Sequence, residues 1–228
     1  MSSAKEVAGR AAAERVSDGM VLGLGTGSTV YFTLVRLAER IREEGLAVRG
    51  VPTSLDTEGK AREMGIPLAS LEDVASIDLT IDGADEIDGD YQMIKGGGGA
   101  LLREKVVASI SKREIIVVGR AKVVERLGTT FRLPVEIAPF SRPVIAREMK
   151  RLGAEPHLRH TPGGEVFITD NGNEILDCAF ETGIEDPRSL ERHLALVPGV
   201  VESGLFIDLA QVLVIGDEDG TCEVREKD

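Results

Sequence analysis

The first segment with residue types suited to ligand chemistry is the glycine-rich run 23–29, with the sequence GLGTGST. It follows a short apolar strand predicted at 20–24 and precedes a helix predicted to begin at Val30. Glycines let the backbone approach an anion, and a helix N-terminus supplies free N–H groups and a partial positive charge. The run therefore predicts an anion site; the alternative is an ordinary tight turn with Ser28 as the helix cap.

This run does not match the two familiar nucleotide-binding patterns. The dinucleotide-binding pattern G-x-G-x-x-G requires glycine where Ser28 stands, and no acidic residue ends a second strand about 20 residues later. The Walker pattern requires a lysine immediately before Ser28 or Thr29, and neither position has one. The two adjacent hydroxyl groups of Ser28 and Thr29, beside glycines, fit a single phosphate better than a dinucleotide.

An acidic segment, DGADEIDGD at 82–90, directly follows the apolar strand predicted at 77–81. Carboxylates at the carboxyl end of a parallel strand lie where α/β proteins bind ligands. Asp82 and Asp85 are the better candidates for ligand binding because they are nearest the strand end. The later acidic residues are expected to be solvated: Glu86, Asp88 and Asp90. An exposed acidic loop is the alternative, and a calcium loop is disfavoured because the required ligand positions do not match.

Lys95 precedes four consecutive glycines, residues 96–99, and a helix predicted at 101–110. Such a run carries a large entropic cost that an ordinary turn does not require. The run of glycines makes sense if the backbone must lie against a small molecule while Lys95 supplies a cation. Glu104 would lie in the first turns of the helix. A lone helix glutamate is usually solvated, but three polar loops at successive ends of parallel strands favour a shared site.

The other candidates are weaker. Lys122 follows the strand predicted at 115–118 and could reach the same edge of the sheet. The three histidines, at 157, 160 and 193, lack further ligands, and we assign no chemistry to them. Both cysteines, Cys178 and Cys222, are expected to be free thiols, since two cysteines make neither a disulfide framework nor a metal-ligand pattern.

Strand and helix signals alternate through the first half of the chain, which predicts a parallel sheet with right-handed crossovers. After residue 130 the order becomes strand, helix, hairpin and helix, with the hairpin turn at 170–173. This order is typical of a small α+β unit with an antiparallel sheet, and two later strands could return to the first sheet. We expect a Rossmann-like α/β domain, with helices on both faces, at 1–130 and 205–228, and a small α+β domain at 131–204.

Composition restricts the classes of partner. The 228-residue chain has 27 Lys and Arg against 39 Asp and Glu, a net charge of −12, whereas binding to nucleic acid or anionic membranes needs a basic face. No apolar run approaches the ~20 residues of a membrane span. The N-terminal residues lack the apolar stretch of a secretory signal, so a cytoplasmic protein is expected.

Taken together, the segments 25–29, 82–85 and 95–100, with Glu104, closely resemble the type A ribose-5-phosphate isomerases. The resemblance covers essentially the whole chain, including LPVE at 133–136. It implies interconversion of D-ribose 5-phosphate and D-ribulose 5-phosphate through a cis-enediolate, in the non-oxidative pentose phosphate pathway. It also implies a Rossmann-like domain with a smaller α+β domain, a homodimer, and no metal or organic cofactor.

The resemblance also implies a role for individual residues. Glu104 matches the general base, Asp82 and Asp85 match the catalytic aspartates, and Lys95 matches the active-site lysine. The expected substrate-binding residues are Lys5, Thr26, Gly27, Ser28, Thr29, Gly83, Ala84, Gly96, Gly97, Gly98 and Lys122.

Two alternative functions stay open at this point. A non-catalytic sugar-phosphate sensor would keep the phosphate loop but would not need Glu104 with Lys95. Such a sensor would usually carry a basic DNA-binding segment, which this acidic chain lacks. A nucleotide-dependent dehydrogenase is disfavoured by the glycine spacing.

Overall fold

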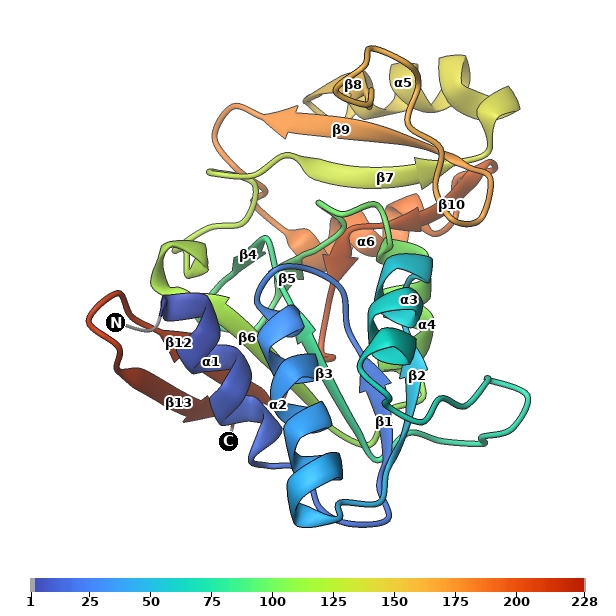
Figure 1. Cartoon of the computed structure of the whole chain (residues 1–228). Coiled ribbons are helices and arrows are strands. Elements are labelled where there is room, and N and C mark those ends of the chain that lie inside the picture. The colour runs from blue at the N-terminus through green and yellow to red at the C-terminus, as the bar shows by residue number, and fades with distance from the viewer. Residues whose placement is uncertain (1–2, 228) are drawn as a thin grey trace. The chain divides into compact units, whose positions relative to one another are not determined.

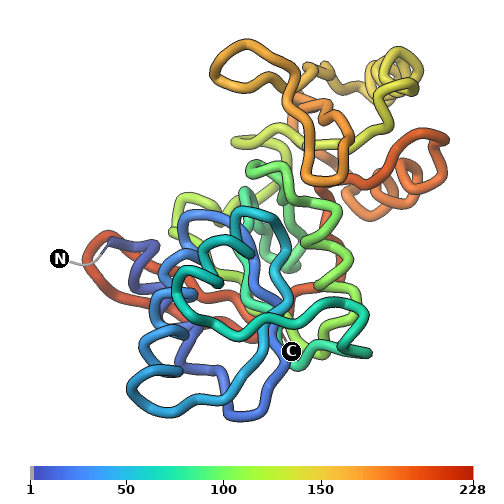
Figure 2. The backbone as a smooth tube through the Cα atoms, turned by 45° about the vertical axis from the view of Figure 1, so that its right-hand side comes forward, coloured from blue at the N-terminus to red at the C-terminus, as the bar shows by residue number. Residues whose placement is uncertain are grey.

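The computed structural model of the chain describes residues 3–227, and the chain forms two compact units. The first unit consists of Met1–Ala84, Arg103–Lys122 and Leu209–Asp228. The second consists of Asp85–Leu102 and Val123–Asp208. The chain therefore passes between the units four times, which can be followed along the backbone in Figure 2.

A six-stranded sheet forms the centre of the first unit, in the order β13-β12-β6-β3-β1-β2 (Figure 1). Five of these strands are parallel, and β13 runs antiparallel to β12. A short turn can join β12 only to an antiparallel neighbour, which explains the direction of β13. The strands are β1 Val21–Leu24, β2 Arg49–Pro52, β3 Leu79–Gly83, β6 Glu114–Gly119, β12 Val212–Gly216 and β13 Cys222–Glu226.

Helices cover both faces of this sheet, as predicted. Successive residues of a strand point to opposite faces. In β1, Leu22 and Leu24 join the apolar cluster that contains Leu34 of α2, whereas Gly23 faces Val107 of α4 on the other side. The helices are α1 Ala4–Ala13, α2 Val30–Glu44, α3 Leu55–Glu63 and α4 Leu101–Ser109, and a short 3-10 turn, η1, spans Arg120–Lys122.

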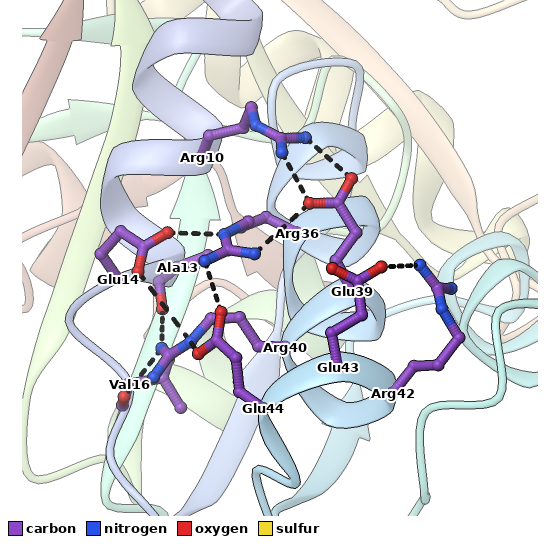
Figure 3. Close-up of polar contacts among 10 residues, drawn as sticks. All are labelled: Arg10, Ala13, Glu14, Val16, Arg36, Glu39, Arg40, Arg42, Glu43 and Glu44. Carbon is purple, nitrogen blue, oxygen red and sulfur yellow. Dashed lines mark hydrogen bonds and ion pairs between the residues drawn. The ribbon is translucent and has the colours of Figure 1, made fainter.

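Ion pairs join the C-terminal end of α1 to α2 (Figure 3). Arg10 of α1 binds both carboxylate oxygens of Glu39, at 3.1 and 2.6 Å. Arg36 lies between Glu14 and Glu44, with N–O distances of 2.5 and 2.6 Å. The two helices are thus held together by charge as well as by their shared apolar face.

The second unit contains a four-stranded antiparallel sheet, β10-β7-β9-β8, and a three-stranded sheet, β11-β5-β4. Its apolar core includes Val135, Leu176 and Met149, from both the large sheet and a helix. The elements are β4 Glu86–Ile87, β5 Met93–Ile94, β7 Leu133–Ile137, η2 Pro139–Ser141, α5 Arg142–Arg151, β8 Ala154–Leu158, β9 Glu174–Phe180, α6 Pro187–Leu194, β10 Val200–Ser203 and β11 Leu205–Phe206.

The predicted hairpin around 170–173 is wrong in its pairing. The turn itself closes, with a hydrogen bond of 2.9 Å from the Thr169 N–H to the Asn173 carbonyl. Residues 166–169 form no strand, however, and β9 pairs with β7 and β8 instead. The physical reason is that this segment directs Phe167 toward Gly99 and Thr169 toward Glu136, rather than along a ladder with β9.

The two late strands behave differently from each other. β12 returns to the first sheet and pairs in parallel with β6, as predicted, but residues 205–206 form β11 and pair with β5. Because β4, β5 and β11 make one small sheet, residues 85–102 group with the second unit, whereas the expected division placed them in the first domain. The domain boundaries 1–130 with 205–228, and 131–204, stay a prediction.

Candidate active site

The glycine-rich run connects β1 to α2, with Thr29 as the helix cap rather than Ser28. Gly27 has a φ of +115°, a conformation that favours glycine. Within residues 3–227, neither the N–H groups nor the hydroxyl groups of Gly27, Ser28 and Thr29 donate a hydrogen bond to protein. Exposed donors at a helix N-terminus are suited to binding an anion, and the hydroxyls of Ser28 and Thr29 are available to add to them.

Thr26 fixes the base of this run. Its hydroxyl lies 2.8 Å from the hydroxyls of Thr53 and Ser54, at the junction of β2 and α3. From the first turn of α3, the Thr57 hydroxyl donates to the Gly25 carbonyl at 2.9 Å. The turn is therefore held by a second βα junction while its tip stays exposed.

Asp82 lies directly beneath the same run. Its side chain is fully buried, and Oδ1 accepts hydrogen bonds from the N–H groups of Thr26 and Gly83, at 3.0 and 2.7 Å. A Cβ at position 25 would stand 2.3 Å from Asp82 Oδ1, so only glycine allows this approach. The structure thus brings Asp82 together with the predicted anion site.

Glu104 lies in the first turn of α4 and is only 5% exposed. One turn later, Val107 packs beside Gly23 of β1. At the other end of the helix, the Ile110 carbonyl accepts a hydrogen bond from the Ile77 N–H, just before β3 begins. α4 therefore runs antiparallel to β1 and β3, which places Glu104 at the carboxyl edge of the sheet, the edge where β3 carries Asp82.

Two predicted lysines belong to the same edge of the first unit. Lys122 is half-buried and ends η1, directly after β6. Ala4 occupies the space that a side chain at Gly216, the last residue of β12, would need. α1 therefore begins at this edge of the sheet, and Lys5, the next residue after Ala4, is exposed. One turn further along α1, Gly9 packs against the Thr29 carbonyl. Lys5 thus lies on the side of α1 that faces the start of α2.

The second unit holds the other predicted catalytic residues. Lys95 follows β5 and is only 2% exposed, an unusual position for a lysine. Its N–H donates to the Gly204 carbonyl at 2.9 Å, and Nζ lies 5.2 Å from the ring centroid of the buried Phe206. This is within the range of a cation–π interaction.

The four-glycine loop is shaped by separate requirements at several of its positions. Gly96 and Gly99 have φ values of +105° and +82°. Gly97 donates its N–H to Asp85 Oδ2 at 2.7 Å, and a Cβ at this position would stand 2.6 Å from Asp85 Oδ1. Asp85, half-buried, therefore lies against the loop, whereas Gly97 and Gly98 stay exposed.

One charged residue at this loop escaped the sequence analysis. Arg159, just after β8, donates from Nη1 to the carbonyls of Gly96 and Gly97, at 2.8 and 3.2 Å. It is separated from the loop by about 60 residues of chain. No spacing rule connects such distant positions, and the sequence analysis found no signal at this arginine.

The prediction that Glu86 is solvated is wrong. Its side chain is fully buried, and its carboxylate accepts hydrogen bonds from the N–H groups of Gly128, Thr130 and Phe131 and from the Thr130 hydroxyl, at 2.5–2.7 Å. Four donors compensate the burial of this charge. Glu86 thus ties β4 to the segment before β7, and the side chain of Asp90 remains exposed as expected.

His193 contacts a carboxylate, and both cysteines are free. Glu148 accepts from Arg151 and lies 2.6 Å from His193 Nε2, and these two neighbours, in that order, lower the pKa of Glu148 to about 2. Cys178 and Cys222 are free thiols, as predicted, and burial raises the pKa of the Cys178 thiol. Among residues 3–227, no three His, Cys, Asp or Glu side chains gather as a metal site would require.

Comparison with known proteins gives a consistent result. The family model of ribose 5-phosphate isomerase A (phosphoriboisomerase A) matches residues 49–220. A ribose-5-phosphate isomerase A of Bacillus mycoides is 50% identical, covering 98% of this chain and all of that protein. The one from Gloeobacter violaceus is 52% identical, over 95% of this chain and 93% of that protein.

Solved structures agree over the whole fold. Ribose 5-phosphate isomerase A of Methanocaldococcus jannaschii superposes with a TM-score of 0.92 at 37% identity, over 98% of each chain. A D-ribose-5-phosphate isomerase in complex with phospho-erythronic acid superposes with a TM-score of 0.95 at 35% identity, over 100% of each chain. None of the helices in the described range is long and apolar enough to cross a membrane. By sequence and by fold, the chain belongs to the ribose-5-phosphate isomerase A family.

Proposed function

We propose that this chain interconverts D-ribose 5-phosphate and D-ribulose 5-phosphate through a cis-enediolate, as a step of the non-oxidative pentose phosphate pathway. The observation that carries the proposal is the full-length match to an isomerase solved with phospho-erythronic acid. That ligand is a four-carbon acid phosphate, and its carboxylate has the planar, charged oxygens that an enediolate develops. A fold that accepts it is suited to the intermediate.

The proton transfer is assigned to Glu104. Isomerisation moves one proton between C2 and C1, and a single carboxylate can take it and return it. Glu104 is buried at the edge of the sheet, away from competing water, and the helix beneath it fixes its place. Asp82 is the proposed proton shuttle for opening the furanose ring.

The developing negative charge is assigned to Lys95 and the glycine loop. A buried ammonium group and backbone N–H donors stabilise an oxyanion more effectively in a site shielded from water. The contributing loop is that of Gly96, Gly97 and Gly98, in which the Gly97 N–H is itself bonded to Asp85. Asp85 binds substrate hydroxyls as well as holding the Gly97 N–H.

The 5-phosphate is assigned to the first unit. The donors of 26–29, described above, provide hydrogen bonds without a competing protein acceptor at Gly27, Ser28 and Thr29. Lys5 and Lys122 add positive charge at the same edge, and the backbone of Gly83 and Ala84 contributes to substrate binding. Binding at this remote group orients the sugar for proton transfer. These roles need no metal or organic cofactor.

We further propose a cytoplasmic homodimer that binds neither nucleic acid nor membranes. The net charge of −12 disfavours anionic polymers and surfaces. Large apolar side chains exposed on the second unit support self-association: Phe140 is 99% exposed and Leu196 is 83% exposed. Exposed apolar surface of this kind is common at protein interfaces.

The test is an isomerase assay with D-ribose 5-phosphate, with ribose as the unphosphorylated control. Ribulose 5-phosphate should form, and ribose should react far more slowly because it lacks the orienting phosphate. Soaking a crystal with a sugar phosphate should place phosphate oxygens about 2.7–3.2 Å from the 26–29 donors. Binding of ribose 5-phosphate without turnover would favour a sensor function instead.

A further inference from the structure

Arg159 holds the four-glycine loop by its carbonyl groups. Nη1 donates to the Gly96 carbonyl at 2.8 Å and to the Gly97 carbonyl at 3.2 Å. Charge-assisted bonds of this kind are stronger than bonds between neutral groups. The loop is otherwise all glycine, so no side chain of its own restricts it.

The arginine itself is fixed from several directions. Asp177 of β9 binds Nε and Nη2 as a fork, at 2.9 and 2.5 Å, and both side chains are largely buried. The Arg159 N–H donates to the Ile175 carbonyl, and the Arg159 carbonyl accepts from the Phe167 N–H. The Phe167 ring also lies 5.7 Å from the guanidinium carbon. Arg159 therefore acts from a rigid base in the antiparallel sheet.

Because these bonds fix the direction of two carbonyl groups, they also fix the direction of the N–H group in each of the same peptides. The described chain has no cis peptide, and in a trans peptide the C=O and the following N–H point to opposite sides. The Gly96 carbonyl points to Arg159, so the Gly97 N–H points away from it, to Asp85 Oδ2 at 2.7 Å. This peptide is held between a cation and an anion, in the orientation that its dipole favours.

The next peptide has the same orientation but an open end. The Gly97 carbonyl also points to Arg159, so the Gly98 N–H points away from it. Gly98 is exposed, and in the described chain its N–H donates to no protein acceptor. A donor fixed in direction and polarised by a cation at its carbonyl is the arrangement that stabilises an oxyanion.

We propose that Arg159 is a positioning residue that holds the Gly96–Gly98 backbone so that the Gly98 N–H is presented to the oxyanion of the reacting sugar. Arg159 does not touch the substrate; it acts through the loop, and Asp177 orients it. This inference rests on the proposed isomerase function. It adds the four-stranded antiparallel sheet, which contains Asp177, to the parts of the molecule that determine the rate.

The test compares Arg159→Met with Arg151→Met, which removes another forked arginine of the same unit that pairs with Glu148 away from the loop. The kcat of Arg159→Met should fall about 10- to 100-fold, with a smaller change in KM, because the lost orientation matters most in the transition state. Arg159→Lys should recover part of the rate, since lysine offers a cation without the fork. Arg151→Met should retain the wild-type rate.

A spectroscopic readout separates this role from simple support of the fold. In protein labelled with ¹⁵N-glycine, the amide signals of Gly97 and Gly98 should shift in Arg159→Met and stay in place in Arg151→Met. Asp177→Asn, which keeps the guanidinium but loosens its fork, should shift them in the same direction and lower kcat by a smaller factor. If Arg159→Met does not fold, Arg159→Lys and Asp177→Asn answer the same question.

The outcomes distinguish the inference from the function on which it rests. Wild-type protein that does not isomerise ribose 5-phosphate overturns the proposed function, whatever the variants do. Active wild type with an unchanged kcat in the Arg159 variants overturns the inference alone. A loss confined to KM, or an unmoved Gly98 signal beside a lowered kcat, overturns it as well.

Discussion

At the scale of single residues, the proposed site is notable for buried charge. Asp82, Lys95 and Glu104 are all at least 95% buried, although side chains of these types are rarely placed so deeply. Burial of a charge lowers stability unless partners compensate it. Asp82 accepts two backbone hydrogen bonds, and Lys95 Nζ lies beside the Phe206 ring, so each buried group has a compensating contact.

The residue that should matter most for turnover is Glu104. Glu104→Gln keeps the shape of the side chain but removes the basic oxygen, so kcat should fall about 10²–10⁴-fold while ligand binding survives. Steady-state kinetics and calorimetric titration with phospho-erythronic acid measure the two effects. Glu43→Gln, an exposed change in α2, is the control. Near-normal turnover in Glu104→Gln would move the base elsewhere, with Asp82 the next candidate.

Lys95 should act mainly in the transition state. Lys95→Ala removes the cation that we propose meets the enediolate charge, so kcat should fall by a larger factor than KM rises. Initial rates over a range of ribose 5-phosphate concentrations separate the two parameters. A raised KM with an unchanged kcat would make Lys95 a ground-state binder.

At the scale of elements, helix ends and strand starts depend on a few long-range contacts. Arg40 of α2 donates from Nη1 to the carbonyls of Ala13 and Val16, at 2.7 and 2.9 Å, and so satisfies groups at the end of α1 (Figure 3). Asp78 satisfies a backbone group at the start of β1, because its Oδ2 accepts a hydrogen bond from the Val21 N–H at 2.9 Å. Both contacts connect segments that are distant in sequence.

Loss of the Arg40 contact should lower stability. Arg40→Met leaves two carbonyls without their charged donor, so the free energy of unfolding should fall by about 1.5–3 kcal/mol. Arg42→Met is the matched control, since Arg42 is 66% exposed, against 13% for Arg40, and pairs only with Glu43 among the residues described. The control should stay within about 0.5 kcal/mol of wild type. Urea unfolding measures both, and equal effects would argue against the capping role.

Asp78 should make part of the stability depend on pH. Its bond to Lys112, and then its bond to the Val21 N–H, hold the pKa of Asp78 below its ordinary value of 3.8. A carboxylate with a lowered pKa in the folded state adds stability above its ordinary pKa, and that stability is lost as the pH falls through the folded-state pKa. The stability difference between wild type and Asp78→Asn should therefore be larger at pH 6 than below pH 3.

Urea unfolding at the two pH values measures this difference. Lys112→Met removes the main cause of the lowered pKa and should leave Asp78→Asn with a smaller pH-dependent effect. A difference that is the same at pH 6 and in acid would show that the carboxylate contributes through its shape rather than its charge.

Local signals in the sequence indicate most elements of the first unit, although not its edge strand β13. Gly45, with a φ of +73°, ends α2, and the Ser54 side chain caps α3, because both effects act over a few residues. Strands β4, β8, β10 and β13 were not predicted, since their pairing depends on partners elsewhere in the chain rather than on their own pattern. The same limit applies to the site: the loops were visible in the sequence, whereas Arg159 and the burial of Glu86 emerge only from the fold.

At the scale of the whole molecule, the proposed dimer can be tested directly. Sedimentation equilibrium should give about twice the chain mass of 24.4 kDa. Replacing the exposed apolar side chains in Phe140→Ser and Leu196→Ser should shift the equilibrium toward the monomer, because each loses apolar area that an interface would bury. Glu218→Ser, a polar change on the first unit, is the control. A wild-type chain that sediments as a monomer would contradict the proposal.

Strand β12 lies beside β6 in the sheet, although most of the second unit separates the two along the chain. During synthesis, β6 therefore emerges from the ribosome long before its parallel neighbour β12 has been made. During that interval, the apolar residues 115–118 form a sheet edge with which other nascent chains can pair. Chaperones that shield β6 until β12 emerges should thus determine how much of the newly made protein escapes aggregation.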